Sequence, residues 1–358
     1  MLRLVPLQLK ASKKAIPSMV LLIILTQSVF PLMQAWSPDP EPDYKYFIIP
    51  YVQTCNPFEY PERQNYTKTI VIVDGQEMVI PEYQTGVFEP TRNPLKWWLN
   101  CVSYKIFDTP KLVPIFFNIS LMPLVYLLTV QLTKDRFIGL LALGAFVANP
   151  LYSNWISSGI YDQVWSFFLI LSVYLMYRFK DGGLPYLSFF VSLTAKTLGL
   201  LYLPAWFYSY IKTESSKTRK IMFTFILFAL LACVFIISGG KLQWFTGGEL
   251  GFHPENEHDI IYRNFEMLWE IVLPLVFFVL LSTNFRPEHP SPLRLLCVIW
   301  MVNGLFTTVI IYLFSNQFQF VYRFVPFAVF MSIFVAVVFV DTCRCVLELI
   351  LKRQSRHK

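Results

Sequence analysis

Charge is scarce in this sequence. Only 15% of its 358 residues are Asp, Glu, Lys or Arg, whereas 55% are hydrophobic and 17% are aromatic. A soluble domain of this length does not bury so much apolar surface, so the composition excludes an ordinary soluble globular protein. The mean hydropathy of +0.49 agrees, and we expect the bilayer to be the solvent for much of the chain.

Common nucleotide-binding and catalytic motifs are missing as well. The sequence holds no Walker loop, no GxSxG element and no dinucleotide-binding fingerprint, so it gives no support to those enzyme classes. Its glycine pairs lie at loop ends and indicate turns, at residues 182–183, 239–240 and 247–248.

Long apolar runs take the place of charge. Several of them reach the roughly 20 residues that cross about 30 Å of hydrocarbon. We interpret these runs as spans: residues 16–36, 112–132, 137–154, 161–178, 221–239, 267–283, 294–315 and 320–341. A further run, 184–211, is interrupted by Thr194-Ala195-Lys196-Thr197. It is long enough for one tilted helix or for two short helices packed as a hairpin.

Basic residues concentrate on one side of these spans. One set of segments holds 19 Lys or Arg against 5 Asp or Glu: residues 1–15, 133–136, 178–183, 212–220, 284–294 and 342–358. Outside these segments and Asp341, the chain holds 11 Lys or Arg against 17 Asp or Glu. The positive-inside rule then places both termini in the cytoplasm, provided that 184–211 enters and returns on that side with Lys196 near the outer turn. Because the basic excess follows topology, the net charge of +7 does not indicate a nucleic-acid partner.

The predicted fold is an all-α polytopic membrane protein with about nine or ten transmembrane or half-transmembrane helices. We expect it in the plasma or endoplasmic reticulum membrane, with a retained first span, because that apolar run exceeds a typical signal core. The predicted parts are a cytoplasmic N-terminus with the first helix, an outer loop, a helix bundle and a basic cytoplasmic tail: residues 1–36, 37–111, 112–341 and 342–358.

The outer loop 37–111 is predicted to mix strands and helix. Thr69–Val73 and Gln76–Ile80 flank Asp74-Gly75, which favours a hairpin with a type I′ turn. Residues 94–107 follow a helix pattern with paired tryptophans, typical of a helix that lies at the membrane surface.

Two cysteines and a sequon also fall in this loop. Cys55 and Cys101 could form a disulfide on the outer side of the membrane. Asn65-Tyr66-Thr67 is a glycosylation triplet on the same side, a pattern that is frequent by chance.

An acidic cluster follows the first span within "WSPDPEPDYKYF". Asp39, Glu41 and Asp43 stand within a few residues of the hydrocarbon, where a charge is costly unless it has a partner or a task. The cluster could supply a general base or coordinate a divalent cation such as Mg²⁺ or Mn²⁺. Asp43 ranks first, because Tyr44 and other aromatic residues that can sit at the interface follow it. The alternative is a solvated, proline-stiffened exit loop.

Two cations are predicted near the same outer surface. Lys196 interrupts an apolar run, and Arg323 follows Tyr322 just before the last span. Together they could bind an anion at the membrane edge. The alternatives are a lysine that snorkels to the surface and an arginine that anchors the helix at the interface.

Other polar residues could line the same pocket. Asp162 stands at the outer start of a span in "SSGIYDQVW", where its carboxylate could instead cap the helix. His253, Glu257 and His258 in "HPENEHD" could bind a metal, although their spacing matches no standard motif and a solvated loop is the alternative.

This layout resembles the GT-C membrane glycosyltransferases, a group that includes the protein mannosyltransferases and the enzymes that use dolichol-phosphate mannose. In that family the first large outer loop follows the first span, begins with an acidic motif and carries helices along the membrane. "EPDYKYF" is similar to that motif, residues 137–211 look like the middle spans, and "YRFVPF" is similar to an Arg-Phe-x-x-Pro element near the last spans. The acids here are spaced by prolines, and no WWDYG-like motif is present, which argues against an oligosaccharyltransferase.

The resemblance implies a hexosyltransferase that moves a sugar from a polyprenyl-phosphate donor to a protein, lipid or glycan acceptor in cell-envelope synthesis. Lys196 and Arg323 would then hold the donor phosphate, and Asp43 would deprotonate the acceptor hydroxyl, with inversion at the anomeric carbon. The rival interpretation is a non-catalytic multispan protein, a transporter or an assembly subunit. A transporter would tend to show internal repeats, and the sequence shows no convincing one.

Overall fold

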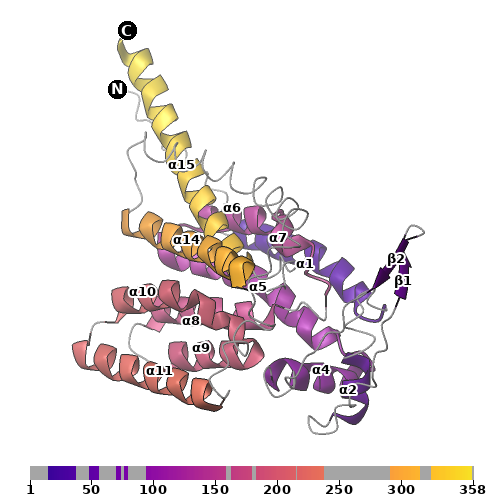
Figure 1. Cartoon of the computed structure of the whole chain (residues 1–358). Coiled ribbons are helices and arrows are strands. Elements are labelled where there is room, and N and C mark those ends of the chain that lie inside the picture. The colour runs from indigo at the N-terminus through magenta and orange to yellow at the C-terminus, as the bar shows by residue number, and fades with distance from the viewer. Residues whose placement is uncertain are drawn as a thin grey trace.

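The computed structural model describes the backbone of ten stretches: residues 15–37, 48–55, 70–73, 76–79, 94–158, 163–179, 183–214, 216–237, 291–314 and 324–356. Helices dominate these stretches (Figure 1), and one strand pair accompanies them. In chain order the elements are α1 (Ala15–Gln34), α2 (Ile49–Thr54), β1 (Ile70–Val73), β2 (Gln76–Val79), α4 (Pro94–Phe107), α5 (Leu112–Thr133), α6 (Arg136–Val147), α7 (Pro150–Ser153), α8 (Val164–Phe179), α9 (Leu184–Ala195), the 3₁₀ helix η2 (Thr197–Tyr202), α10 (Leu203–Thr213), α11 (Lys217–Ile237), α14 (Ser291–Phe314) and α15 (Val325–Arg356).

Three helices in the described part of the chain are long and apolar enough to cross a membrane, namely α1, α5 and α15. On α1, large apolar side chains face outward with no protein cover; Leu22, Phe30 and Met33 are each more than half exposed. Such a surface is costly in water and favourable against lipid tails. The chain therefore has the composition and helix lengths of a membrane protein.

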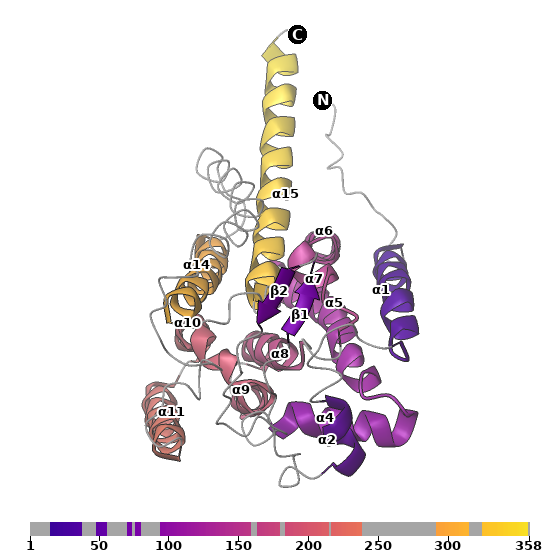
Figure 2. The ribbon, with the colours of Figure 1, turned by 45° about the vertical axis from the view of Figure 1, so that its right-hand side comes forward.

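Helix α5 lies at the centre of the packing. It contacts α1, α4, α6 and α8, while α8 contacts α9 and α10, and α15 packs against α6 and α14. Figure 2 shows α1 standing at the edge of this bundle and α2 lying against α4. The core between the helices is filled by large aromatic side chains that are fully buried, among them Trp165, Trp206 and Trp300.

Two glycines allow close helix contacts. A Cβ atom on Gly139 of α6 would lie 2.6 Å from a methyl group of Val130 on α5, and one on Gly304 of α14 would lie 2.8 Å from the Cβ of Phe327 on α15. Small residues at helix crossings are the usual way in which membrane helices approach closely.

The interrupted run at 184–211 folds as a hairpin. Tyr186, near the start of α9, contacts the ring of Tyr210 near the end of α10, and Phe189 stacks on Trp206. The Tyr186 hydroxyl also donates a hydrogen bond of 3.3 Å to Glu214, just past α10. The two short helices are therefore antiparallel, with both ends at one end of the bundle and Lys196 at the turn.

One predicted span is wrong in its extent. Residues 137–154 do not form a single helix, because α6 ends at Val147 and the separate short helix α7 begins at Pro150. The residue before a proline is disfavoured in the helical conformation. Asn149 is accordingly extended, and its side chain accepts a hydrogen bond from the Leu151 amide, which starts the new turn.

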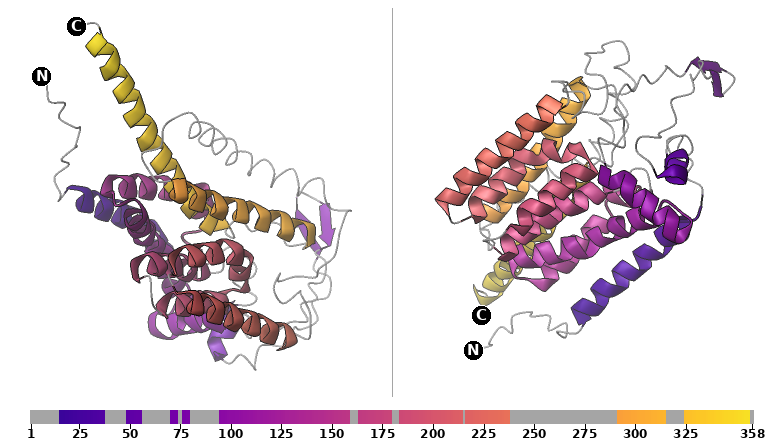
Figure 3. Two further views of the ribbon diagram at one scale, coloured as in Figure 1. Left: turned by 90° about the vertical axis from the view of Figure 1, so that its left-hand side faces the viewer. Right: turned by 90° about the horizontal axis from the view of Figure 1, so that it is seen from below.

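The last helix also differs from the prediction. The sequence places the end of the last span at residue 341, but α15 continues unbroken through that position to Arg356. Figures 1 and 3 show its carboxyl-terminal half projecting clear of the bundle, obliquely to α14. Nothing in residues 342–356 interrupts a helix, since this segment has no proline or glycine.

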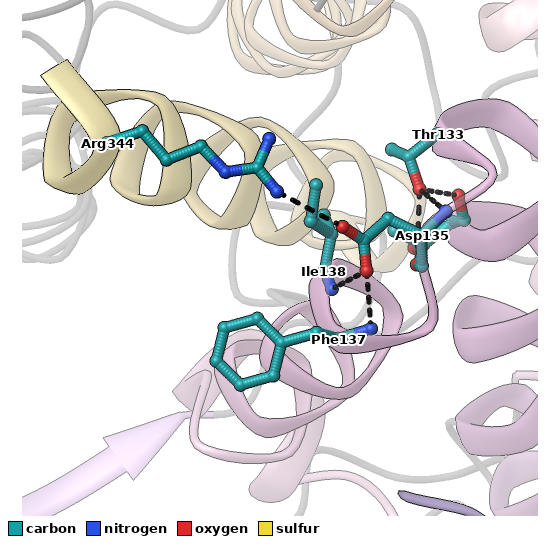
Figure 4. Close-up of polar contacts among 6 residues, drawn as sticks. Thr133, Asp135, Phe137, Ile138 and Arg344 are labelled. Carbon is teal, nitrogen blue, oxygen red and sulfur yellow. Dashed lines mark hydrogen bonds and ion pairs between the residues drawn. The ribbon is translucent and has the colours of Figure 1, made fainter. Parts of the chain in front are cut away.

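Charged residues join helices where the bundle meets the projecting half of α15, which we call the α15 end. Buried Asp341 of α15 pairs with Arg294 of α14. Arg344 of α15 lies 3.5 Å from Asp135, whose other carboxylate oxygen accepts a bond from the Phe137 amide and caps α6 (Figure 4).

Strands β1 and β2 pair antiparallel, with Ile70 opposite Val79 and Val73 opposite Gln76. The two segments are those that the sequence marks as a hairpin. Residues 74 and 75, on which the predicted turn type depends, lie outside the described residues.

Candidate functional site

The site is built at the opposite end of the bundle, where α2 and α4 lie, which we call the α4 end (Figures 1 and 2). Here the end of α1 is tied to the corner between α4 and α5. The Trp36 indole donates to the carbonyl of Phe107 over 3.2 Å, and the Thr109 hydroxyl donates to the carbonyl of Ala35. Ser37, from which the acidic segment departs, is therefore fixed beside the carboxyl end of α4.

The chain returns from the acidic segment onto the same helix. Cys55, which follows α2, is bonded to Cys101 of α4, with 5.8 Å between their Cα atoms. Tyr51 of α2 packs its ring edge-on against Trp97 of α4, with 4.8 Å between ring centroids, and burial raises the pKa of its phenol. The disulfide that the sequence left open is thus present, and it locks α2 to α4.

Two described residues, Ser37 and Ile48, flank the acidic segment in the sequence. Ile48 is buried at the start of the return path, and Asp43 precedes it by five residues. Asp39, Glu41 and Asp43 lie between these two anchors in the sequence, outside the described residues.

Lys196 lies at the turn between α9 and η2. Its backbone is extended, its amide donates to Ser192 over 2.9 Å, and its carbonyl accepts from Gly199 over 3.2 Å. The Ser192 hydroxyl in turn donates 2.8 Å to the carbonyl of Trp165, near the start of α8. Helix α9 also contacts α4, so α4 is a neighbour both of the helix that carries Lys196 and of the anchors of the acidic segment.

Gly199 makes this turn compact. A Cβ atom there would lie 3.0 Å from the Leu193 side chain and 3.1 Å from the Ser192 hydroxyl. The Trp165 indole N–H, buried beneath the turn, has no acceptor within the described stretches. A buried donor left without a partner is costly, so an acceptor supplied by a ligand would lower that cost.

Asn118 of α5 holds the loop that precedes α8. It is fully buried, and its amide nitrogen donates to the carbonyls of Ile156 and Ser158 at 3.0 and 3.1 Å. Its carbonyl oxygen accepts from the Gln163 amide at 2.7 Å. One side chain thus clamps both flanks of residues 159–162, the stretch that contains Asp162.

Two buried lysines at this end were missed from the sequence. Lys111, at the start of α5, is only 2% exposed, and Lys96 of α4 is 8% exposed. Lys96, Asn100 and Ser103 follow helical spacing, and α4 buries this polar face while Trp98 and Ile106 face outward. The spacing was a usable signal, but the apolar residues Trp97 and Leu99, which are buried as well, are the ones that an amphipathic helix is expected to bury.

Most predicted site residues lie outside the described part of the chain: Asp39, Glu41, Asp43, Asp162, His253, Glu257, His258, Tyr322 and Arg323. Lys196 is described. Arg323 precedes buried Val325, where α15 begins, and α15 contacts α7. Among the described residues, no three His, Cys, Asp or Glu side chains group as metal ligands.

No protein family model matches the sequence, and no curated protein or solved structure matches it significantly.

Proposed function

We propose that this chain is a membrane glycosyltransferase of the GT-C type, which transfers a sugar from a polyprenyl-phosphate donor to an acceptor hydroxyl. One observation carries the proposal. Helix α4 contacts α9, whose end carries Lys196, and α4 also holds both anchors of the acidic segment, at Phe107 and Cys101. This arrangement supports a site at the α4 end in which Lys196 and the three carboxylates of the acidic segment act together.

The chemistry follows from these charges. Lys196 holds the donor phosphate and offsets the negative charge that grows on it as the glycosidic bond breaks. Asp43 accepts the proton of the acceptor hydroxyl, whose oxygen attacks the anomeric carbon from the face opposite the phosphate. The configuration at that carbon is inverted, and the polyprenyl phosphate leaves with the electron pair of the broken bond.

Arg323 and Trp165 complete the proposed donor site. Arg323 supplies a second positive charge from the start of α15. The Trp165 indole donates a hydrogen bond to an oxygen of the bound donor, which satisfies its buried N–H. A divalent cation held by the acidic segment would share the neutralisation of the phosphate.

The test is a transfer assay with the purified full-length protein and polyprenyl-phosphate sugars. Loss of a general base typically costs about 10²–10⁴-fold in rate, so Asp43→Asn should fall by that factor. Lys196→Ala should fall about 10²–10³-fold. Lys105→Ala is the matched control, because Lys105 lies on α4 at the same end but is exposed; its rate should not change.

The outcomes separate the alternatives. Full activity in Asp43→Asn would remove that residue from the mechanism, and equal losses in Lys196→Ala and Lys105→Ala would remove a specific phosphate site. A wild-type protein that transfers no sugar from any polyprenyl-phosphate donor would overturn the proposal and leave a transporter or an assembly subunit.

A further inference from the structure

The projecting half of α15 is mostly exposed, although Arg344 contacts Asp135 near its start. Its last fully buried residue is Asp341, which pairs with Arg294, and no side chain from 342 to 354 is buried. At 1.5 Å per residue the 32-residue helix is about 48 Å long, whereas the hydrocarbon core of a bilayer is about 30 Å thick. The helix is therefore longer than a perpendicular crossing needs.

This half carries an apolar stripe. Cys343, Val346, Leu347 and Ile350 follow the spacing i, i+3, i+4, i+7, so they share one helix face. Val346 is 43% exposed, Leu347 46% and Ile350 52%, and Cys343 is exposed as well. Arg344, Glu348 and Lys352 form a separate polar row at four-residue spacing.

The charge of the same segment is strongly positive. Residues 342–358 contain Arg344, Lys352, Arg353, Arg356 and Lys358 against Glu348 alone. Basic residues with an adjacent apolar face are the features that bind a helix to an anionic lipid surface.

We infer that the projecting half of α15, residues 342–356, leaves the bilayer at a slant on its inner side and binds anionic lipid head groups. The stripe enters the interface between head groups and acyl chains, while the basic residues contact phosphate groups. Since α15 is one unbroken helix, a tilted crossing carries its excess length through the head-group layer with one face turned toward the membrane. The inference is independent of the proposed glycosyl transfer.

A second copy of the chain fits this surface less well. A stable protein interface buries about 1,200–2,000 Å² in total, far more than four side chains of one helix provide. Arg353 continues the spacing of the stripe, three residues after Ile350, so two copies facing each other would bring like charges together. A lipid surface has the opposite charge and needs no matching shape.

The test places nitroxide labels on the full-length protein in nanodiscs, with the free cysteines replaced by serine and the Cys55–Cys101 bond kept. Labels enter through Val346→Cys, Leu347→Cys and Ile350→Cys on the stripe, and through Glu348→Cys on the opposite face as the matched control. In discs with phosphatidylserine, the stripe labels should be reached by oxygen dissolved in lipid, and the control label by a water-soluble nickel complex.

The strength of this binding should depend on the basic side chains and on anionic lipid. In the background Lys352→Gln with Arg353→Gln, or in discs of phosphatidylcholine alone, the ratio of lipid-bound to unbound label should fall by roughly five-fold for each basic side chain that no longer meets an anionic head group. Two results would overturn the inference. Stripe labels as open to the nickel complex as the control label would leave this half in water, and stripe labels shielded from both reagents would indicate a protein partner.

Discussion

At the scale of single residues, Asn118 ties three chain segments together. It lies on α5, donates to two carbonyls after α7 and accepts from the Gln163 amide before α8. Its own backbone carbonyl accepts from the Tyr152 hydroxyl at 2.8 Å. The bonds to Ile156, Gln163 and Tyr152 are buried, so water does not readily replace one that is broken.

Replacing this side chain should be costly. Asn118→Ala leaves buried carbonyls and an amide without the Asn118 bonds, and each such loss costs about 1–3 kcal/mol, so a total of about 2–5 kcal/mol is expected. Thermal unfolding in detergent measures it. Ser120→Ala is the control, because its exposed hydroxyl bonds only Phe116 of its own helix. Equal melting temperatures for the two variants would contradict the role of Asn118.

The partners and the burial of charged residues could not be predicted from the sequence. Asp341 is recognisable in the sequence as an acid at the end of a span, but its partner Arg294 lies 47 residues away. The burial of Lys111 was likewise not predicted, although its position before a span was known. Hydropathy assigns a cost to each charge but does not identify the group that offsets it.

At the scale of elements, the pair α5–α6 depends on a missing side chain. Gly139 lets α6 approach α5 so closely that any added Cβ would lie 3.0 Å from the Tyr126 ring and closer still to Val130. Gly144, farther along the same helix, has nothing within 4 Å of the equivalent position.

These two glycines should respond in opposite directions. Gly139→Ala should reduce the free energy of unfolding by about 1–3 kcal/mol, because the helices must separate. Gly144→Ala should leave it unchanged or raise it by about 0.5–1 kcal/mol, through the higher helix propensity of alanine. Denaturation curves in the same detergent compare them. The packing at Gly139 would be refuted if both variants were stabilised.

At the scale of the whole molecule, the hairpin formed by α9 and α10 sets the direction of every later helix. A single crossing at 184–211 would reverse the side on which α11, α14 and α15 begin. The contacts of Tyr186 with Tyr210 and Glu214 place both ends of the hairpin together, which agrees with the distribution of basic residues.

Cysteine labelling tests this topology. In a chain whose free cysteines are replaced by serine, Gly183→Cys and Ser216→Cys should react with an impermeant maleimide from the same face of the membrane. Lys105→Cys on α4 should react only from the other face. Labelling of positions 183 and 216 from opposite faces would exclude the hairpin, and labelling of 105 together with 183 would exclude the two distinct ends of the bundle.

The sequence alone determined the class of protein and most helix positions, since these depend on local properties. Composition identified a membrane protein, the run lengths located α1 and α5, and the break at Lys196 together with the charge bias favoured the hairpin. The cysteines Cys55 and Cys101 were candidates for a disulfide because both fall in one outer segment, and the structure decided that they are bonded.

Only the tertiary structure decided which faces of the helices meet. In a membrane helix the apolar residues extend all round, so hydropathy does not distinguish a face packed on protein from a face against lipid. The clamp at Asn118, the buried face of Lys96 on α4 and the pair Arg294–Asp341 join segments or faces that no local pattern connects. The extent of α15 was likewise decided by the structure. A hydropathy window ends a span where charged residues begin, whereas the backbone hydrogen bonds of a helix continue through charged residues.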